Sequence, residues 1–155
     1  MKSKSLLACL LLLAACSQPE KQAAPDKQAA NPLLGTWKLI TGIIVEKGDS
    51  TITDYTKDKS FVKIINETHF AFLLHDLNKG QDSTTAVFAS GGGRYSLKDS
   101  TYTEHLEYCT DRAWEGHDFP FTVTITGDTL VQRGVEKVEA EGIERLNIER
   151  YVRAK

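Results

Sequence analysis

Cysteine is scarce in this chain, which contains only Cys9, Cys16 and Cys109. The first two lie in an N-terminal stretch that we expect to stay outside the folded domain, so Cys109 has no partner for an internal disulfide. The folded part must therefore be stabilised by its own core. Because no cluster of basic residues lies near Cys109 in the sequence, we interpret it as a buried small hydrophobe rather than as a reactive thiol.

Long apolar runs and clustered basic residues are absent as well. The apolar run over residues 6–13 is far shorter than the roughly 20 residues that a membrane-spanning helix needs. The formal net charge is −2, and acidic and basic residues are mixed throughout, which argues against a nucleic-acid partner. No serine, cysteine or pair of carboxylates stands in a recognisable nucleophilic or acid–base arrangement. We therefore expect no catalytic residues, no enzyme activity and no cofactor.

The histidines do not predict a metal site. His69 and His75 bracket one hydrophobic segment, but about 20 Å separates their backbones along an extended strand. The other histidines have single acidic neighbours, which fall short of three ligands.

Gly91-Gly92-Gly93 lacks the lysine and threonine of a phosphate loop, so we interpret it as a bulge or a sharp bend in a strand.

The N-terminal residues carry a clear pattern. Lys2 and Lys4 precede the apolar run, and Leu13-Ala14-Ala15-Cys16 ends it. A positive segment, a short apolar segment and small residues before a cleavage point are typical of a secretory signal peptide, here over residues 1–15. The last four residues resemble the lipobox of bacterial lipoproteins, which implies that Cys16 is lipidated and becomes the mature N-terminus. The alternative is an ordinary signal peptide that happens to contain a cysteine.

Residues 16–32 predict a flexible linker with no large apolar residue. Its spaced prolines favour an extended, semi-rigid chain with a reach of at most roughly 50 Å. Lipid chains on Cys16 would hold the protein at a membrane, because each buried CH₂ contributes about 0.8 kcal/mol. Ser17 stands where many lipoproteins retained at the inner membrane have aspartate. The resemblance therefore implies a lipid-anchored protein of the cell envelope, at the outer membrane and facing the periplasm.

Residues 33–155 predict a single all-β domain. Segments rich in β-branched and aromatic residues alternate with turn-forming clusters about every ten residues. Short connections at residues 66–68, 98–100 and 127–128 predict antiparallel hairpins, and residues 110–116 predict one helical turn. The predicted strands cover residues 36–47, 60–65, 69–75, 84–90, 94–97, 101–108, 119–126, 129–133 and 145–153. Such a meander of about eight or nine strands favours a closed up-and-down antiparallel barrel, with a β-sandwich as the alternative.

Alternation along these strands indicates which side chains face inward. The apolar residues of the strand at 119–126 share one face with Phe121. The inner face of the first strand begins at Trp37 and, by strict alternation, includes Ile43 and Val45. The apolar residues of the last strand share their face with Arg150. An arginine on the inner side needs a partner, and Trp37 supplies an aromatic ring if the first and last strands pair.

These residues resemble the lipocalin and fatty-acid-binding (calycin) superfamily. Gly35-Thr36-Trp37 is similar to its Gly-x-Trp signature, and Arg150 is similar to the arginine that packs across that tryptophan. Segments 90–97, 102–108, 119–121 and 127–128 resemble uncharacterised lipocalin-like domains of exported lipoproteins from Bacteroidetes-type bacteria. The likeness spans residues 33–153. It implies a lipocalin-like barrel and an envelope location, but no settled activity.

The strand predicted at residues 101–108 carries the candidate site. Its more apolar face, which we expect to point inward, places Glu104 between two tyrosines inside the barrel. A buried carboxylate must be paired or protonated, and Arg94 or Arg150 could pair with it. The cluster is either a structural part of the barrel wall or a group that orients a ligand. The candidate ligand-binding residues are Arg94, Tyr95, Tyr102, Glu104, Tyr108 and Phe121.

The sequence thus predicts a lipid-anchored envelope protein whose barrel binds a small apolar or amphiphilic molecule. The alternative is an envelope scaffold with a packed barrel, no ligand, and loops that contact another, unidentified protein. A barrel of this size can be filled by its own side chains or can hold one small ligand. The volume of the interior decides between the two.

Overall fold

A continuous antiparallel sheet forms the fold in the computed structural model, which describes residues 31–155. Residues 1–30, with the predicted signal peptide, Cys16 and most of the predicted linker, lie outside the described residues. Two short 3₁₀ helices, η1 (Arg112–Trp114) and η2 (Glu139–Glu141), follow β6 and β8. The strands are β1 (Gly35–Glu46), β2 (Asp49–Asp54), β3 (Lys59–Ile65), β4 (His69–Asp76), β5 (Phe88–Lys98), β6 (Thr101–Cys109), β7 (Asp118–Thr126), β8 (Thr129–Val138) and β9 (Ile143–Arg153).

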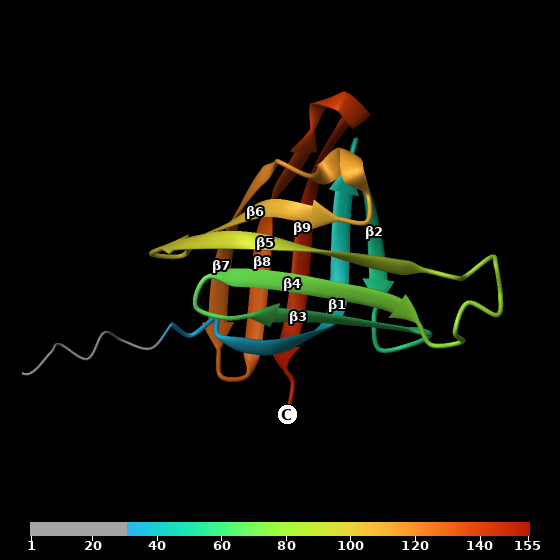
Figure 1. Cartoon of the computed structure of the whole chain (residues 1–155), viewed down its shortest axis with the longest axis horizontal. Helices are drawn as coiled ribbons and strands as arrows, with labels where there is room; N and C mark the ends of the chain where they lie inside the picture. The colour runs from blue at the N-terminus through green and yellow to red at the C-terminus, as the bar shows by residue number, and fades with distance from the viewer. Residues whose placement is uncertain (1–30) are drawn as a thin grey trace, which may run out of the picture.

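The sheet closes into a barrel because β1 has neighbours on both sides. It pairs with β9 along one edge and with β3 along the other, and each strand from β3 to β8 pairs with the next strand in sequence. Eight antiparallel strands of the described chain form the closed barrel, and β2 is an extra strand on the second half of β1. In Figure 1, β3 to β6 cross β1 and β7 to β9 almost at right angles. The all-β up-and-down barrel expected from the sequence is confirmed, and it is consistent with a lipocalin-like fold.

Two strand predictions need correction. No strand is predicted at residues 49–54, yet β2 turns back onto β1 through Lys47 and Gly48, both of which have positive φ. The sequence also predicts separate strands at residues 84–90 and 94–97, whereas β5 is continuous from Phe88 to Lys98. The two merge because the three glycines between them stay within the hydrogen-bonded sheet instead of ending a strand.

The three glycines lie where β5 passes very close to its neighbours. The pairing of β5 with β6 shifts register between Gly92 and Gly93, so a bulge lies at the predicted place, although its additional residue, Glu107, belongs to β6 and not to the glycine segment. A Cβ atom on Gly93 would collide with the carbonyl oxygen of His105, and one on Gly92 would lie 2.5 Å from the carbonyl oxygen of Phe70. Only glycine therefore allows the neighbouring backbones to approach so closely.

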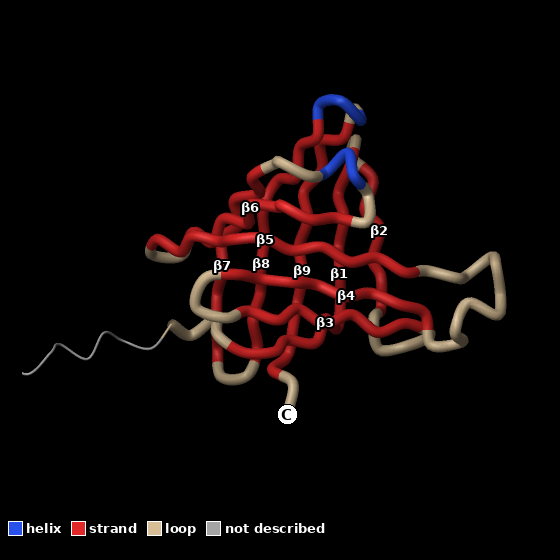
Figure 2. The backbone as a smooth tube through the Cα atoms, in the orientation of Figure 1, coloured by secondary structure: helices blue, strands red, loops and turns tan. Residues whose placement is uncertain are grey.

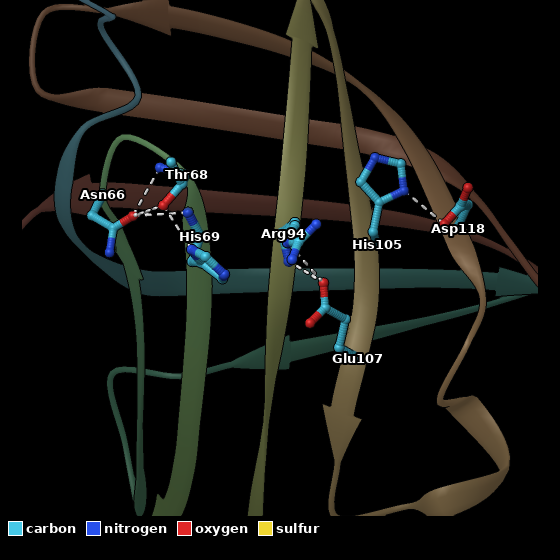
Figure 3. Close-up of polar contacts among 7 residues, drawn as sticks. All are labelled: Asn66, Thr68, His69, Arg94, His105, Glu107 and Asp118. Atoms are coloured by element: carbon cyan, nitrogen blue, oxygen red, sulfur yellow. Dashed lines mark hydrogen bonds and ion pairs between the residues drawn. The ribbon is translucent and has the colours of Figure 1, made fainter.

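The predicted hairpins are confirmed by the pairing of the strands that flank each connection. At the turn between β3 and β4, Asn66 Oδ1 accepts hydrogen bonds from the backbone N–H groups of Thr68 at 2.9 Å and His69 at 2.8 Å (Figure 3). At the turn after β7, Gly127 adopts a positive φ of 57°. The helix η1 confirms the helical turn predicted within residues 110–116.

A bulge in β1 changes which of its side chains face inward. The register of β1 against β9 shifts between Leu39 and Thr41. Leu39 is buried before the shift, and Ile44 lines the interior after it. The prediction that Ile43 and Val45 share the inner face is therefore wrong, because strict alternation does not continue through an inserted residue.

One end of the barrel is plugged by large side chains. Leu33, Trp37, Phe70, Tyr102 and Tyr151 are each at most 3% exposed. The indole Nε1 of Trp37 donates a hydrogen bond to the carbonyl oxygen of Leu33 at 2.7 Å, which holds the chain as it enters β1. Figure 1 shows the C-terminus at this end, and Figure 2 shows both short helices at the opposite end.

Arg153, rather than Arg150, packs across Trp37. Its guanidinium carbon lies 4.1 Å from the centroid of the indole ring. Arg150 is exposed on the outer face, so its assignment to this role is wrong. A Cβ atom on Gly35, whose φ is 128°, would lie 2.8 Å from Nη1 of Arg153. The glycine that starts β1 therefore makes room for the arginine that ends β9.

Candidate functional site

The barrel interior contains a cavity of about 410 Å³. It opens to solvent beside η1, where the exposed residues Thr110 and Asp111 form part of its lining. The aromatic part of the wall consists of Tyr55, Phe61, Phe72, Trp114, Phe119 and Phe121. The charged and amide part consists of Lys63, Glu104, Gln132, Glu136, Arg145, Asn147 and Glu149. Both the volume and the mixed lining are typical of small-molecule sites.

A buried ion pair joins two opposite parts of the cavity wall. Lys63 Nζ, on β3, lies 2.6 Å from Glu104 Oε1, on β6. The same ammonium group donates to Gln132 Oε1, on β8, at 3.1 Å. Lys63 and Glu104 are 2% and 7% exposed, so bulk water solvates neither charge. Each charge depends on the other because an unpaired buried ion is costly.

A second ion pair lies nearer the opening. Arg145 Nε donates to Glu136 Oε2 at 2.8 Å, and Asn147 Nδ2 donates to Glu136 Oε1 at 2.7 Å. Both oxygens of Glu136 are thereby bonded. The guanidinium carbon of Arg145 also lies 4.8 Å from the centroid of the Trp114 ring. These contacts connect β8 and β9 to η1 at the mouth of the cavity.

A third carboxylate in the cavity wall, that of Glu149, has no cation of residues 31–155 within hydrogen-bond distance. Glu149 Oε2 accepts a hydrogen bond from the Tyr151 hydroxyl at 2.8 Å. The same oxygen lies 3.9 Å from Lys63 Nζ, which is too far for a hydrogen bond. Glu149 belongs to β9 and lines the cavity. Among the described residues, no hydrogen bond reaches its other oxygen, Oε1, which can therefore accept a further donor.

Burial and charge shift the ionisation of this cluster. Burial raises the pKa of Glu104 and of Glu136, although the nearby cations Lys63 and Arg145 oppose the rise. Burial acts to lower the pKa of Lys63, but the neighbouring glutamates, Glu104 above all, raise it above its usual value. Lys63 is therefore held in its charged form, and the interior stays polar even where water is excluded.

The aromatic side of the cavity offers an apolar surface. The rings of Phe61 and Phe72 are stacked, with centroids 5.7 Å apart and planes 8° from parallel. Trp114 packs against Phe119 with a centroid distance of 5.5 Å. A molecule with an apolar body and a polar group would find matching surfaces on the two sides of the cavity.

Four of the six predicted ligand-binding residues point toward the interior or the plug. Glu104 and Phe121 line the cavity. Tyr102 is fully buried among the plugging side chains. Tyr95 packs against Tyr102, with ring centroids 5.3 Å apart. These two tyrosines support the closed end and do not line the cavity.

The other two predicted residues, Arg94 and Tyr108, are exposed on the outer face, so their inward assignment is wrong. Tyr108 changes face because the register shift between β5 and β6 makes Glu107 an additional residue. Arg94 instead lies 3.6 Å from Glu107 on the outside of the barrel (Figure 3). The partner of Glu104 is Lys63 and not either predicted arginine.

Sequence reasoning misses most of the polar wall. For Lys63 a signal exists, because it has the same parity as Phe61 and Ile65 in a predicted strand. For β9 the alternation of apolar and polar residues predicts the wrong inner face, since the more apolar face is the outer one and the polar face lines the cavity. The missed residues are Lys63, Gln132, Glu136, Arg145, Asn147 and Glu149.

Polar contacts on the outer face are separate from the cavity. His105 Nδ1 lies 2.7 Å from Asp118 Oδ1 across β6 and β7 (Figure 3). Among residues 31–155, no group of three or more His, Cys, Asp or Glu side chains could hold a metal ion. Cys109 is half-buried in the cavity wall, and its burial raises the pKa of the thiol. Its thiol is therefore not activated as a nucleophile.

Comparison with protein-family models, with curated proteins and with solved structures gave no match for this chain. In the part that the structure describes, no helix is long and apolar enough to cross a membrane. The fold assignment therefore depends on strand order and pairing alone.

Proposed function

We propose that this barrel binds a small amphiphilic molecule in its interior. The observation that carries the proposal is the cavity of about 410 Å³, which has aromatic rings on one part of its wall and charged or amide groups on another. Barrels of eight strands can be filled by side chains or can hold one small ligand, and the open volume favours the second case. Two of the three cavity glutamates pair with cations, and burial raises the pKa of the Cys109 thiol in the same wall, which favours binding over catalysis.

The test is native mass spectrometry of the full-length protein purified from its membranes. Ile44→Trp on β1 places a large ring in the cavity, whereas Ile43→Trp changes the adjacent residue on the outer face. We expect a retained small molecule in the unsubstituted protein and in Ile43→Trp, and none in Ile44→Trp. Absence of a retained molecule from all three proteins, together with no uptake of an added neutral apolar probe, would remove the basis of the proposal.

The proposal extends to the location of the protein. On the basis of the lipobox and linker, Cys16 is lipidated and anchors a lipocalin-like lipoprotein in the cell envelope, at the outer membrane and facing the periplasm. Asn31 enters the structure at the plugged end, where its Nδ2 donates to the Tyr95 hydroxyl at 2.9 Å. The cavity opens beside η1, at the opposite end. A tether joined at the plugged end leaves the opening free to face the periplasm.

Labelling and fractionation test this location. When cells are grown with a radiolabelled fatty acid, the label should be incorporated into the unsubstituted protein and not into Cys16→Ala. Protease added to intact cells should leave the protein in the outer-membrane fraction uncleaved. Equal labelling of the Cys16→Ala protein would contradict the anchor, and cleavage in intact cells would contradict the periplasmic side.

Apolar side chains on the outer face favour a second candidate, an interaction module. Ile52 on β2 and Val135 on β8 are 69% and 51% exposed. Ile43 pairs with Ile52 and with Ile148, so an apolar row crosses the outer surface of β2, β1 and β9. Crosslinking of the intact protein in membranes separates the candidates. A single stoichiometric partner that is lost in Ile52→Asp and retained in Ile44→Trp would favour interaction over ligand binding.

A further inference from the structure

The charged side chains of the cavity do not balance. Lys63 pairs with Glu104 at 2.6 Å, and Arg145 pairs with Glu136 at 2.8 Å. Glu149 is a third carboxylate, only 14% exposed, and the described residues provide no third cation in the cavity wall. With its carboxylates ionised, the interior has one more negative than positive charge. Charge that is removed from water attracts a counter-charge more strongly than an exposed group does.

Glu149 has different neighbours on the two strands that flank β9. Glu149 pairs with Gln132 on β8 and with Gly42 on β1. The Gln132 side is occupied, since Gln132 binds the ammonium group of Lys63. The Gly42 side has no side chain of its own, and the ring of Tyr55 covers it: a Cβ atom on Gly42 would lie 3.0 Å from that ring. A carboxylate and an aromatic ring thus adjoin the same part of the cavity.

We infer that the ligand of this cavity is an organic cation, an amine in its ammonium form, bound by the carboxylate of Glu149 beside the ring of Tyr55. This inference rests on the proposed function, because it names the charge of the molecule that the barrel binds. The ammonium group donates charge-assisted hydrogen bonds to Glu149 and is attracted to the aromatic ring. The apolar body of the ligand lies against the stacked rings of Phe61 and Phe72.

The same charges disfavour the opposite kind of ligand. A carboxylate such as that of a fatty acid would add a further negative charge to a wall that already contains Glu104, Glu136 and Glu149. Asp111, exposed at the opening, extends the negative potential to the entrance and favours the entry of cations. With a neutral molecule, the nearest cation to Glu149 would be the ammonium group of Lys63, which lies 3.9 Å away and is bound more closely, at 2.6 Å, by Glu104.

Three aromatic compounds of similar size test the charge directly. Binding of 2-phenylethylamine, 2-phenylethanol and 3-phenylpropanoate to the full-length protein in phosphatidylcholine nanodiscs is measured by equilibrium dialysis near neutral pH, with empty nanodiscs as the blank. We expect the amine to bind at least about tenfold more tightly than either other compound, the size of effect that a hydrogen bond to a charged group provides.

Two matched variants test the residue. Glu149→Gln should weaken amine binding at least about tenfold and leave alcohol binding unchanged. Glu144→Gln changes a carboxylate that is 68% exposed on the same strand, and it should leave both unchanged. Unaltered amine affinity in Glu149→Gln would overturn the role of Glu149.

The outcomes separate this inference from the proposed function. Equal binding of amine and alcohol would leave a ligand-binding barrel and overturn the charge inference, because the positive charge would then add nothing to the affinity. Binding of none of the three compounds would overturn the inference alone, since retention of a molecule in native mass spectrometry decides the proposed function independently. If Glu149→Gln does not fold, the three compounds on the unsubstituted protein decide.

Discussion

The guanidinium carbon of Arg153 lies 4.1 Å from the centroid of the Trp37 ring, at the closed end of the barrel. The same side chain donates from Nη1 to the carbonyl oxygen of Leu34 at 2.7 Å and from Nη2 to that of Pro32 at 3.0 Å. One arginine at the end of β9 therefore covers the aromatic plug and satisfies two carbonyl groups of the chain that leads into β1. These contacts join the two ends of the described chain.

Loss of these contacts should be measurable against a neighbouring control. Arg153→Ala should lower the free energy of unfolding by about 1–3 kcal/mol, because it uncovers the indole and leaves two carbonyl groups without donors. Arg150→Ala, which changes an exposed arginine on the same strand, should stay within about 0.5 kcal/mol of the unsubstituted protein. Urea denaturation of both variants measures the difference. Equal losses would contradict the assignment of the stacking role to Arg153.

Trp37 itself should contribute more to the free energy of unfolding than any residue at the open end. It is 0% exposed, and Trp37→Ala leaves a large cavity in the plug. We expect a loss of about 3–5 kcal/mol in the free energy of unfolding. Trp114→Ala removes a half-buried ring beside the opening and should cost less. Thermal denaturation followed by circular dichroism ranks the two variants, and an unchanged melting temperature in Trp37→Ala would contradict its role in the core.

The glycines of β5 give a third prediction. Gly93→Ala should destabilise the barrel by roughly 2 kcal/mol or more, because its Cβ atom would collide with the carbonyl oxygen of His105 and force β5 and β6 apart. Ser96→Ala, on the exposed face of the same strand, serves as the control. Urea denaturation measures both. A Gly93→Ala protein as stable as Ser96→Ala would show that the strands separate at no cost.

The sequence predicts the architecture better than it predicts the wall of the cavity. Turn residues and β-rich segments determine where strands begin and end, so the hairpins and the closed barrel follow from local chemistry. The faces of the strands are harder, because each bulge reverses the alternation. The shift in β1 moves Ile43 outward, and the shift between β5 and β6 moves Tyr108 outward. A single inserted residue has no strong local signature in the sequence.

The polar interior explains the remaining errors. Sequence reasoning assigns the apolar face of a strand to the inside, and in β9 this places Arg150 inward. The structure has the reverse arrangement: Asn147 and Glu149 face the cavity while Leu146 and Ile148 pair with apolar residues of β1 on the outside. Because a barrel that holds polar groups inside inverts the usual burial rule, only the pairing partners of β9 reveal its inner face.

The buried pair of Lys63 and Glu104 leads to a fourth prediction. Lys63→Met should lower the free energy of unfolding by about 3–5 kcal/mol near neutral pH, because the carboxylate of Glu104 is left buried without its cation. Lys63→Met/Glu104→Leu removes both charges and should recover at least half of that loss. Urea denaturation of the single and double variants measures the recovery. A double variant no more stable than Lys63→Met would contradict the account.

The same variant has a predictable dependence on pH. Burial raises the pKa of Glu104 above 4.5, and loss of the opposing Lys63 raises it further. The folded Lys63→Met protein therefore retains a proton that the unfolded chain releases, so its stability falls as pH rises from 4.5 through the raised pKa of the folded state. The loss relative to the unsubstituted protein should be smaller near pH 5 than near pH 8. A constant difference, or the opposite slope, would contradict the burial of an ionised Glu104.

Cys109 offers a direct measure of access to the cavity. Burial raises the pKa of its thiol, so alkylation by iodoacetamide near neutral pH should be slower than for an exposed cysteine and should accelerate as the pH rises toward and beyond 9.0. Because Cys109 lines the cavity, bound 2-phenylethylamine should slow the reaction further. Peptide mass spectrometry of the full-length protein in nanodiscs gives the rate. The matched control is Tyr108→Cys in a Cys109→Ala background, which places the thiol one residue away on the outer face, where Tyr108 is 68% exposed. That thiol should react quickly with or without the amine, and equal protection at both positions would place the bound amine outside the barrel.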